Sequence, residues 1–327
     1  MSSQPQSLDA RKGGLARWGE SLVPAVSLLV VFIPIVYKQP NLLSPERYHA
    51  LLTMTLVFGI PIALASLGQM LAMSIGEIDF SMENLVSLTT CVIGAVMGKN
   101  LALGFALLFG ILVVYMLIGA FVHLKKLPSI IITIGMSFIW TGLAITIQPT
   151  PGGSIPAPLV AALRLKPPWI PYPVVAAAVL ALVGHFLMFK TNLGILARGV
   201  GDNVKSIQQA GHSALRVRVA VFGLVGLFGI LSGATLAGLT TSADPLLAKN
   251  YTLLSVAAVV LGGGAFVGGK VSAAGTVLGA FSMHLVTNLL VALKISTDWQ
   301  AGVKGIIILL ALYIGGFFKR TGKVRYF

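Results

Sequence analysis

The stretch SIGEIDFSMENL, residues 74–85, interrupts a long apolar run and decides how the chain must be folded. No Asp, Glu, Lys or Arg occurs from Tyr48 to Gly76 or from Asn84 to Gly98. Three of the nine acidic residues of the chain fall inside the stretch: Glu77, Asp79 and Glu83. Each ionised acid costs about 2.5–3.5 kcal/mol at the centre of a bilayer. The chain is therefore expected to break here, with the acids shielded from lipid by protein or water.

The composition outside this stretch is that of an integral membrane protein. The 327 residues are 56% hydrophobic and only 10% charged, whereas soluble domains carry about 25% charged residues. The net charge is +14, which in a soluble protein suggests a nucleic-acid partner. In a membrane protein the same excess follows from basic cytoplasmic loops, so we expect a lipid bilayer and no nucleic acid.

Apolar segments of about 20 residues predict an all-α membrane protein, a polytopic bundle of about ten transmembrane helices. The region 48–98 has room for two spans, with the acidic stretch at their junction. The remaining predicted spans are 21–37, 101–122, 129–147, 171–189, 219–241, 251–268, 271–293 and 299–318.

The distribution of Lys and Arg predicts that the N- and C-termini are both cytoplasmic. With ten spans, fifteen of the 23 basic residues fall on the side of the N-terminus, seven on the other side, and Lys304 within the last span. Cytoplasmic loops are the more basic ones. The predicted organisation is a cytoplasmic tail at 1–20, a transmembrane domain at 21–318 and a cytoplasmic tail at 319–327.

The longest predicted cytoplasmic connection is 190–218, and its centre reads GDNVKSIQQAG. Asp202 suits a helix N-cap and Gly211 a helix stop, with room for about two turns between them. Val204 and Ile207 are three residues apart and share one helix face. Two interpretations remain open: a simple connector, or an amphipathic helix that inserts into a groove of a cytoplasmic partner.

Glycines recur at a spacing of four residues in the second half of the chain. This spacing lets helices approach closely in lipid, so we assign it to helix packing. The strand–loop–helix context and the Lys-Ser/Thr ending of a phosphate-binding loop are missing. The residues concerned are Gly229, Gly233, Gly264, Gly268, Gly275 and Gly279.

Other polar residues within the predicted spans have two interpretations: they face a polar path through the bundle, or they make contacts between helices, which we favour. They are Gln69, Gln148, His185, His284 and Asn288.

Four stretches occur in an order that belongs to a known family. They are Ile75-Gly76-Glu77-Ile78-Asp79-Phe80-Ser81; Gly201-Asp202-Asn203 through Ala210-Gly211; Tyr251 through Gly263 with Gly268-Gly269-Lys270 and Gly275-Thr276-Val277-Leu278-Gly279; and Trp299-Gln300 with Lys304-Gly305-Ile306-Ile307. The first resembles a Gly-Gly-Ile-Asp-Leu-Ser signature and the second a cytoplasmic coupling-helix loop. Together they resemble the permease subunits of bacterial ABC importers, in the branch that carries ribose and other monosaccharides.

The resemblance implies a transport subunit of the bacterial inner (plasma) membrane, not an enzyme. Two permease chains, identical or paralogous, would surround a path for a sugar or a similar small polar solute. A periplasmic binding protein would deliver the solute, and cytoplasmic ABC ATPase subunits would bind the coupling loop. No cofactor is expected on this chain, because ATP and Mg²⁺ would bind to the ATPase. The coupling residues would be Gly201, Asp202, Asn203, Val204, Ile207, Ala210 and Gly211.

The chain departs from the family pattern in two places. Met82-Glu83-Asn84 stands where small or apolar residues are usual, and Thr252-Leu253-Leu254-Ser255 follows Tyr251 where an acid is common. The departures leave nucleosides or amino acids open as alternative solutes.

The acidic stretch itself has two interpretations. It can begin a helix near the cytoplasmic surface, between two spans, with Ser81 or Asp79 as the N-cap and Glu83 in the first turn. It can also line the translocation path, through Glu77, Asp79, Ser81, Glu83 and Asn84. An ion-coupled secondary transporter that uses Glu77, Asp79 and Glu83 is a further alternative. The sequence shows no metal-ligand cluster and no nucleophile–base motif, so we predict no metal site and no catalytic residue.

Overall fold

The computed structural model describes residues 29, 32–37, 48–164, 170–296, 299–300, 302–303 and 305–306. The predicted tails, 1–20 and 319–327, lie outside the described residues, as does most of the first and last predicted spans. Within the described part the chain is helical, apart from turns, loops and an isolated bridge between Gly152 and Ala243. The predicted all-α class is therefore confirmed.

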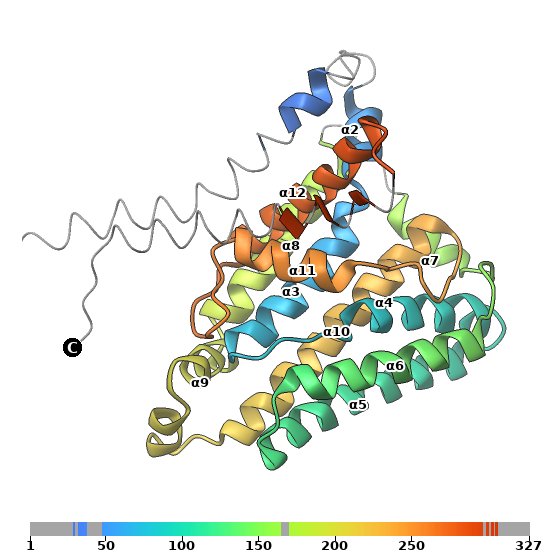
Figure 1. Cartoon of the computed structure of the whole chain (residues 1–327). Coiled ribbons are helices and arrows are strands. Elements are labelled where there is room, and N and C mark those ends of the chain that lie inside the picture. The colour runs from blue at the N-terminus through green and yellow to red at the C-terminus, as the bar shows by residue number, and fades with distance from the viewer. Residues whose placement is uncertain are drawn as a thin grey trace, which may run out of the picture.

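The helices follow one another with short connections (Figure 1). In chain order they are α2 (Tyr48–Leu56), α3 (Gly59–Ser74), α4 (Met82–Cys91), the π-helix η2 (Val92–Met97), α5 (Leu101–Lys125), α6 (Ser129–Ile147), α7 (Ala157–Leu163), α8 (Tyr172–Phe189), α9 (Asn192–Gln209), α10 (Ala214–Thr240), α11 (Tyr251–Leu261) and α12 (Ala273–Ala292).

Five of the described helices, α5, α6, α8, α10 and α12, are long and apolar enough to cross a bilayer. They coincide closely with five predicted spans. The pair α2 and α3, bent by 41°, provides a sixth if it is one span. The total of ten spans and the side of each terminus stay predictions.

The bend between α2 and α3 has a local cause. Pro61 has no N–H to donate in the first turn of α3, and Ile60 N–H donates to the Val57 carbonyl at 3.1 Å. The Pro61 carbonyl accepts a hydrogen bond from Ser232 Oγ of α10 at 2.6 Å. Every residue of α3 is buried, so this helix forms the centre of the bundle.

Two helices are too short to cross the bilayer alone. The α11 helix has 11 residues, so the predicted span 251–268 is wrong beyond Leu261. The α4 helix has 10 residues and continues as η2 for six more. Non-helical backbone precedes both helices, at 75–81 and 241–250, and their first turns contact each other. Irregular backbone at membrane depth is tolerated only where protein satisfies its polar groups.

Glycines set the closest helix contacts. A Cβ atom at Gly233 would lie 2.5 Å from Thr89 Cβ of α4, and Gly229 lies against Leu85 of the same helix. Gly275 and Gly279 of α12 lie against the backbone at the end of α11.

The assignment to helix packing is wrong for Gly264 and Gly268. Both lie between α11 and α12, where the backbone turns. The physical reason is the early end of α11, which leaves these glycines outside any helix.

Candidate functional site

Asp79 is completely buried and is held by hydrogen-bond donors. Its Oδ1 accepts from Ser81 N–H and from Ser81 Oγ, both at 2.7 Å, and its Oδ2 accepts from the Tyr115 hydroxyl at 3.0 Å. The Tyr115 ring stacks on Trp140 of α6 with 6.2 Å between ring centroids. Because donors occupy both carboxylate oxygens, Asp79 fixes the loop between α3 and α4.

The backbone on both sides of Asp79 is bonded to the neighbouring helices. Ile78 N–H donates to Ser129 Oγ at 3.1 Å, and Phe80 N–H donates to Thr133 Oγ1 at 3.0 Å. The Gln69 side-chain amide pairs with the Asp79 peptide group, at 3.1 and 3.2 Å, in the orientation that satisfies both groups. The irregular segment therefore meets the condition for non-helical backbone inside a membrane.

Glu77 forms an ion pair with Arg218 of α10. Each side chain is 14% exposed. The pair joins the acidic stretch to the first turns of the helix that follows α9.

Glu83 and Asn84 lie in the first turn of α4 and are half-buried. Glu83 Oε2 accepts from Asn250 N–H at 3.0 Å, and Glu83 N–H donates to Thr252 Oγ1 at 3.1 Å. Asn84 Nδ2 donates to Thr141 Oγ1 of α6. Glu83 thus stands where the helix-start interpretation expects an acid, but its carboxylate joins α4 to the start of α11.

Ser81 occupies the cap position of α4 without a side-chain bond to that helix. Its hydroxyl bonds to Asp79 instead. Neither Ser81 nor Asp79 caps α4 in the way that the sequence suggested, because the two side chains bond to each other and to Tyr115.

The predicted coupling element is the second part of α9. The helix is kinked at Asn203, whose φ and ψ are −158° and 100°. Asn203 Oδ1 accepts from Lys205 N–H at 3.0 Å and from Ser206 N–H at 3.3 Å. The N-cap is therefore Asn203, and the assignment to Asp202 is wrong by one residue. The kink explains the shift, because Asp202 still belongs to the first part of α9.

The end of this element agrees with the prediction. Gly211 has φ +83°, and His212 N–H donates to the Ile207 carbonyl at 3.1 Å. This is the bonding of a glycine-terminated helix. Val204 and Ile207 pack against the bundle, while Ala210 is exposed. We call residues 204–210 the coupling segment.

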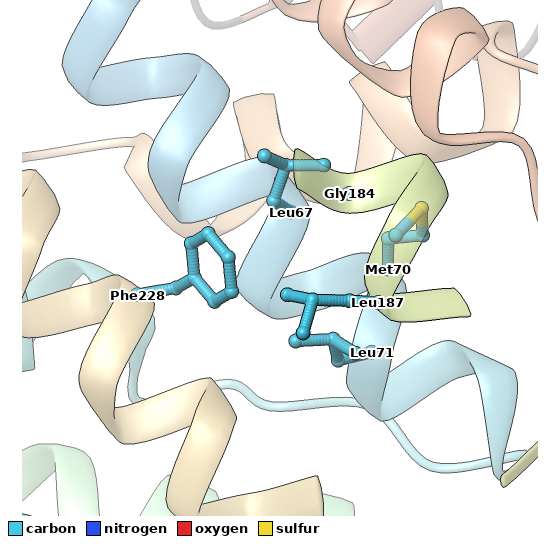
Figure 2. Close-up of a pocket in the computed structure, with 6 residues that line it drawn as sticks. All are labelled: Leu67, Met70, Leu71, Gly184, Leu187 and Phe228. Carbon is cyan, nitrogen blue, oxygen red and sulfur yellow. The ribbon is translucent and has the colours of Figure 1, made fainter. Parts of the chain in front are cut away.

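Two hollows in the described part of the structure differ in what they offer a polar solute. The first lies between α3, α8 and α10 and has no room for even a water molecule (Figure 2). Its lining offers no polar side chain: Leu67, Met70, Leu71, Gly184, Leu187 and Phe228. Such a pocket cannot bond to hydroxyl groups.

The second cavity, of about 230 Å³, is lined by Ile35, Thr55, Asn288, Val291 and Ala292. Asn288 Nδ2 and His284 Nε2 both lie within hydrogen-bond distance of the Thr55 carbonyl, at 3.0 and 2.9 Å. The predicted contacts between helices are confirmed for these two residues. Gln69 bonds instead to the loop that follows its own helix, and His185 stacks on Phe189 of its own helix. Asn288 also faces the cavity, so a polar group is available there.

Comparison with known proteins places the chain in a family. Residues 51–312 match the family described as branched-chain amino acid transport system / permease component. The chain belongs to this permease family. The permease is 26% identical to the ribose import permease protein RbsC of Escherichia coli (strain K12) over 320 residues, which cover 94% of this chain and 98% of the relative.

Two further relatives are also named as sugar permeases. The ribose import permease protein RbsC of Bacillus subtilis (strain 168) is 27% identical, over 90% of this chain and 92% of the relative. The xylose transport system permease protein XylH of Haemophilus influenzae is 34% identical over 145 residues, 44% of this chain and 39% of the relative. No solved structure matches the permease at a significant level.

Sequence reasoning missed the residues that hold the acidic stretch. Tyr115, Ser129 and Thr133 lie in α5 and α6, far from the stretch along the chain. These residues are noticeable in the sequence as polar side chains within apolar spans. Their polarity alone does not predict that they bond to the acidic stretch.

Proposed function

We propose that the permease is the transmembrane subunit of an ATP-driven importer of the bacterial inner membrane. It forms the path for a sugar or similar small polar solute, delivered by a periplasmic binding protein. In this proposal it pairs with a second permease chain, identical or paralogous, and with cytoplasmic ABC ATPase subunits that hold ATP and Mg²⁺. It has ten spans and both termini in the cytoplasm. The relatives named for ribose and xylose support this solute class.

The observation that carries the proposal is the coupling segment. It is a short helix with both ends capped, by Asn203 and Gly211, at one end of the bundle (Figure 1). Its outer residues are exposed while Val204 and Ile207 anchor it to the bundle. Its outward face, with Lys205, Ser206 and Gln209 exposed, is the surface that a cytoplasmic partner would contact in this proposal.

The charges near the coupling segment support a cytoplasmic side. Basic residues lie at the end of α5, at the end of α8 and at the start of α10, all next to cytoplasmic loops in the predicted topology. They are Lys125, Lys126, Lys190, Arg216 and Arg218. Cytoplasmic loops carry an excess of such residues.

Two places offer polar groups to a solute in the proposed path. One is the half-buried pair Glu83 and Asn84, and the other is the cavity at Thr55 and Asn288. Pockets for drug-sized ligands measure about 300–1,000 Å³, so a cavity of about 230 Å³ suits only a small solute. Asp79 and Ser81 are buried, and their proposed role is to fix the wall of the path.

An amino acid is the second candidate solute, because the family description names branched-chain amino acids. The ion-coupled alternative is disfavoured by the surroundings of Asp79. A cation site requires acceptor oxygens, whereas the neighbours of Asp79 donate hydrogen bonds to it.

The experiment is reconstitution of the permease with its ATPase and binding protein in proteoliposomes. We expect uptake of radiolabelled ribose or xylose to require ATP on the side of the membrane that carries the ATPase subunits. Uptake should persist when proton and sodium gradients are collapsed. Uptake of leucine in place of the sugars supports the second candidate. Uptake without ATP, by a chain that purifies without any ATPase, contradicts the proposal.

A further inference from the structure

Three segments that are distant in the sequence meet at one place in the bundle. They are the end of α3, the first part of α9 and the turn between α11 and α12. The contact is made by the backbone of Ser74, Gly76, Gly201, Gly268 and Gly269, which we call the glycine junction. Gly269 N–H donates to the Ser74 carbonyl at 3.0 Å.

The glycine junction leaves no space for side chains. A Cβ atom at Gly268 would lie 2.9 Å from Gly201 Cα and 2.9 Å from Gly76 N. A Cβ atom at Gly201 would lie 2.5 Å from Gly269 N and would also collide with the Ser74 carbonyl. Real Cβ atoms do not approach other atoms this closely, so the three backbones touch directly.

Backbone conformation adds a second requirement for glycine. The φ angles of Gly76, Gly268 and Gly269 are +77°, +96° and +72°. Residues with a Cβ atom seldom adopt such angles. The Asp202 carboxylate lies against Gly269, where a Cβ atom would overlap it.

Direct backbone contact has a mechanical consequence. A contact between side chains can absorb a displacement when the side chains change rotamer, whereas two touching backbones cannot. Gly201 lies two residues before the kink at Asn203, at which the coupling segment begins. Movement of that segment therefore acts on the end of α3 and on the turn that leads into α12, without a flexible side chain between them.

We propose that the glycine junction transmits movement of the coupling segment to α3 and α12, with Gly201 and Gly268 as positioning residues. This inference rests on the proposed function. The ion pair of Glu77 with Arg218 lies next to the junction along the chain and also joins the acidic stretch to α10. The segments held together at this end of the bundle are thus the ones that lead to the polar groups of the proposed path.

The first experiment compares Gly201→Ala with Gly135→Ala in the reconstituted importer. The number of sugar molecules carried per ATP hydrolysed is measured, together with the amount of ATPase that co-purifies. We expect Gly201→Ala to retain the ATPase but to lower the transport ratio by about two- to thirtyfold, the range of measured coupling changes. The control adds a Cβ atom that meets nothing within 4 Å and should keep the wild-type ratio. An unchanged ratio in Gly201→Ala overturns the inference.

The second experiment uses the wild-type importer, and so decides the question even if Gly201→Ala does not accumulate. Hydrogen exchange is compared between the nucleotide-free and the ATP-trapped complex. We expect the peptides covering 74–80 and 265–270 to change their exchange together with the coupling segment. A change confined to 204–210 overturns the inference.

The two proposals fail in different ways. If the wild-type permease takes up solute without ATP and binds no ATPase, the proposed function fails. If uptake is driven by ATP but neither experiment shows the expected change, only the role of the glycine junction fails.

Discussion

Glu83 Oε2 accepts a hydrogen bond from the backbone N–H of Asn250 at 3.0 Å, and so joins the first turn of α4 to the start of α11. The two residues are 167 positions apart. The Glu83 backbone N–H donates to Thr252 Oγ1 in return. A carboxylate near two helix N-termini is in a favourable field, which gives this acid a place inside an apolar bundle.

Replacing Glu83 should therefore lower stability. Glu83→Ala leaves the Asn250 N–H without its acceptor, which costs about 1–3 kcal/mol of the free energy of unfolding. The measurement is thermal unfolding in detergent. Glu83→Gln keeps an acceptor oxygen and should lie between wild type and Glu83→Ala. Equal stability of all three proteins would show that the bond contributes nothing.

Tyr115→Phe should also destabilise the permease. It removes the hydroxyl that donates to Asp79 Oδ2 and contacts Ser81 Oγ. A buried polar group left unsatisfied costs about 1–3 kcal/mol. The control is Tyr37→Phe, because Tyr37 is 84% exposed. A drop in melting temperature as small as that of the control would contradict the role of Tyr115.

The ion pair of Glu77 with Arg218 should behave as a coupled pair. Glu77→Gln leaves Arg218 unpaired at 14% exposure, which we expect to cost up to about 3 kcal/mol of unfolding free energy. The exchanged pair, Glu77→Arg with Arg218→Glu, should recover part of the loss. Arg216→Gln, at an exposed position in the same turns, serves as control. Additive effects of the two exchanges in a double-mutant cycle would rule out coupling.

The cap of the coupling segment should control binding of the ATPase. Asn203→Ala removes the acceptor for Lys205 and Ser206 N–H, a loss of about 0.5–2 kcal/mol of helix stability. We expect less ATPase to co-purify, with membrane insertion unchanged. Asn203→Asp keeps a capping oxygen and should bind normally. If Asn203→Ala retains the full amount of ATPase, the segment is only a connector.

The cavity at Asn288 gives a test of the proposed path. Asn288→Leu removes its polar group and its bond to the Thr55 carbonyl. We expect the rate of sugar uptake to fall by about tenfold, the effect of one hydrogen bond of about 1.4 kcal/mol. The control is Thr287→Ala on the same helix, whose hydroxyl bonds only to the Met283 carbonyl among the described contacts. Normal uptake in Asn288→Leu would remove this cavity from the path.

Much of the helical architecture was predictable because the length of an apolar run is a local property. The sequence indicated α5, α6, α8, α10 and α12 and the break at 74–85 for this reason. The predicted helix boundaries were wrong at two places where the apolar pattern and the residues that end or cap a helix indicate different positions. The α11 helix ends early at a run of glycines, and the kink in α9 moves the cap from Asp202 to Asn203.

The sequence by itself determined that this is a helical membrane protein with a shielded acidic break and a capped connection between residues 190 and 218. Composition and periodicity carry that information, because the bilayer imposes the same requirement on every apolar segment. Only the tertiary structure decided the partner of each acid: Arg218 for Glu77, Tyr115 and Ser81 for Asp79, and Asn250 for Glu83. It also brought Gly76, Gly201 and Gly268 together. Backbone contact depends on how the helices pack, and the type of a residue does not predict which distant residue it will contact.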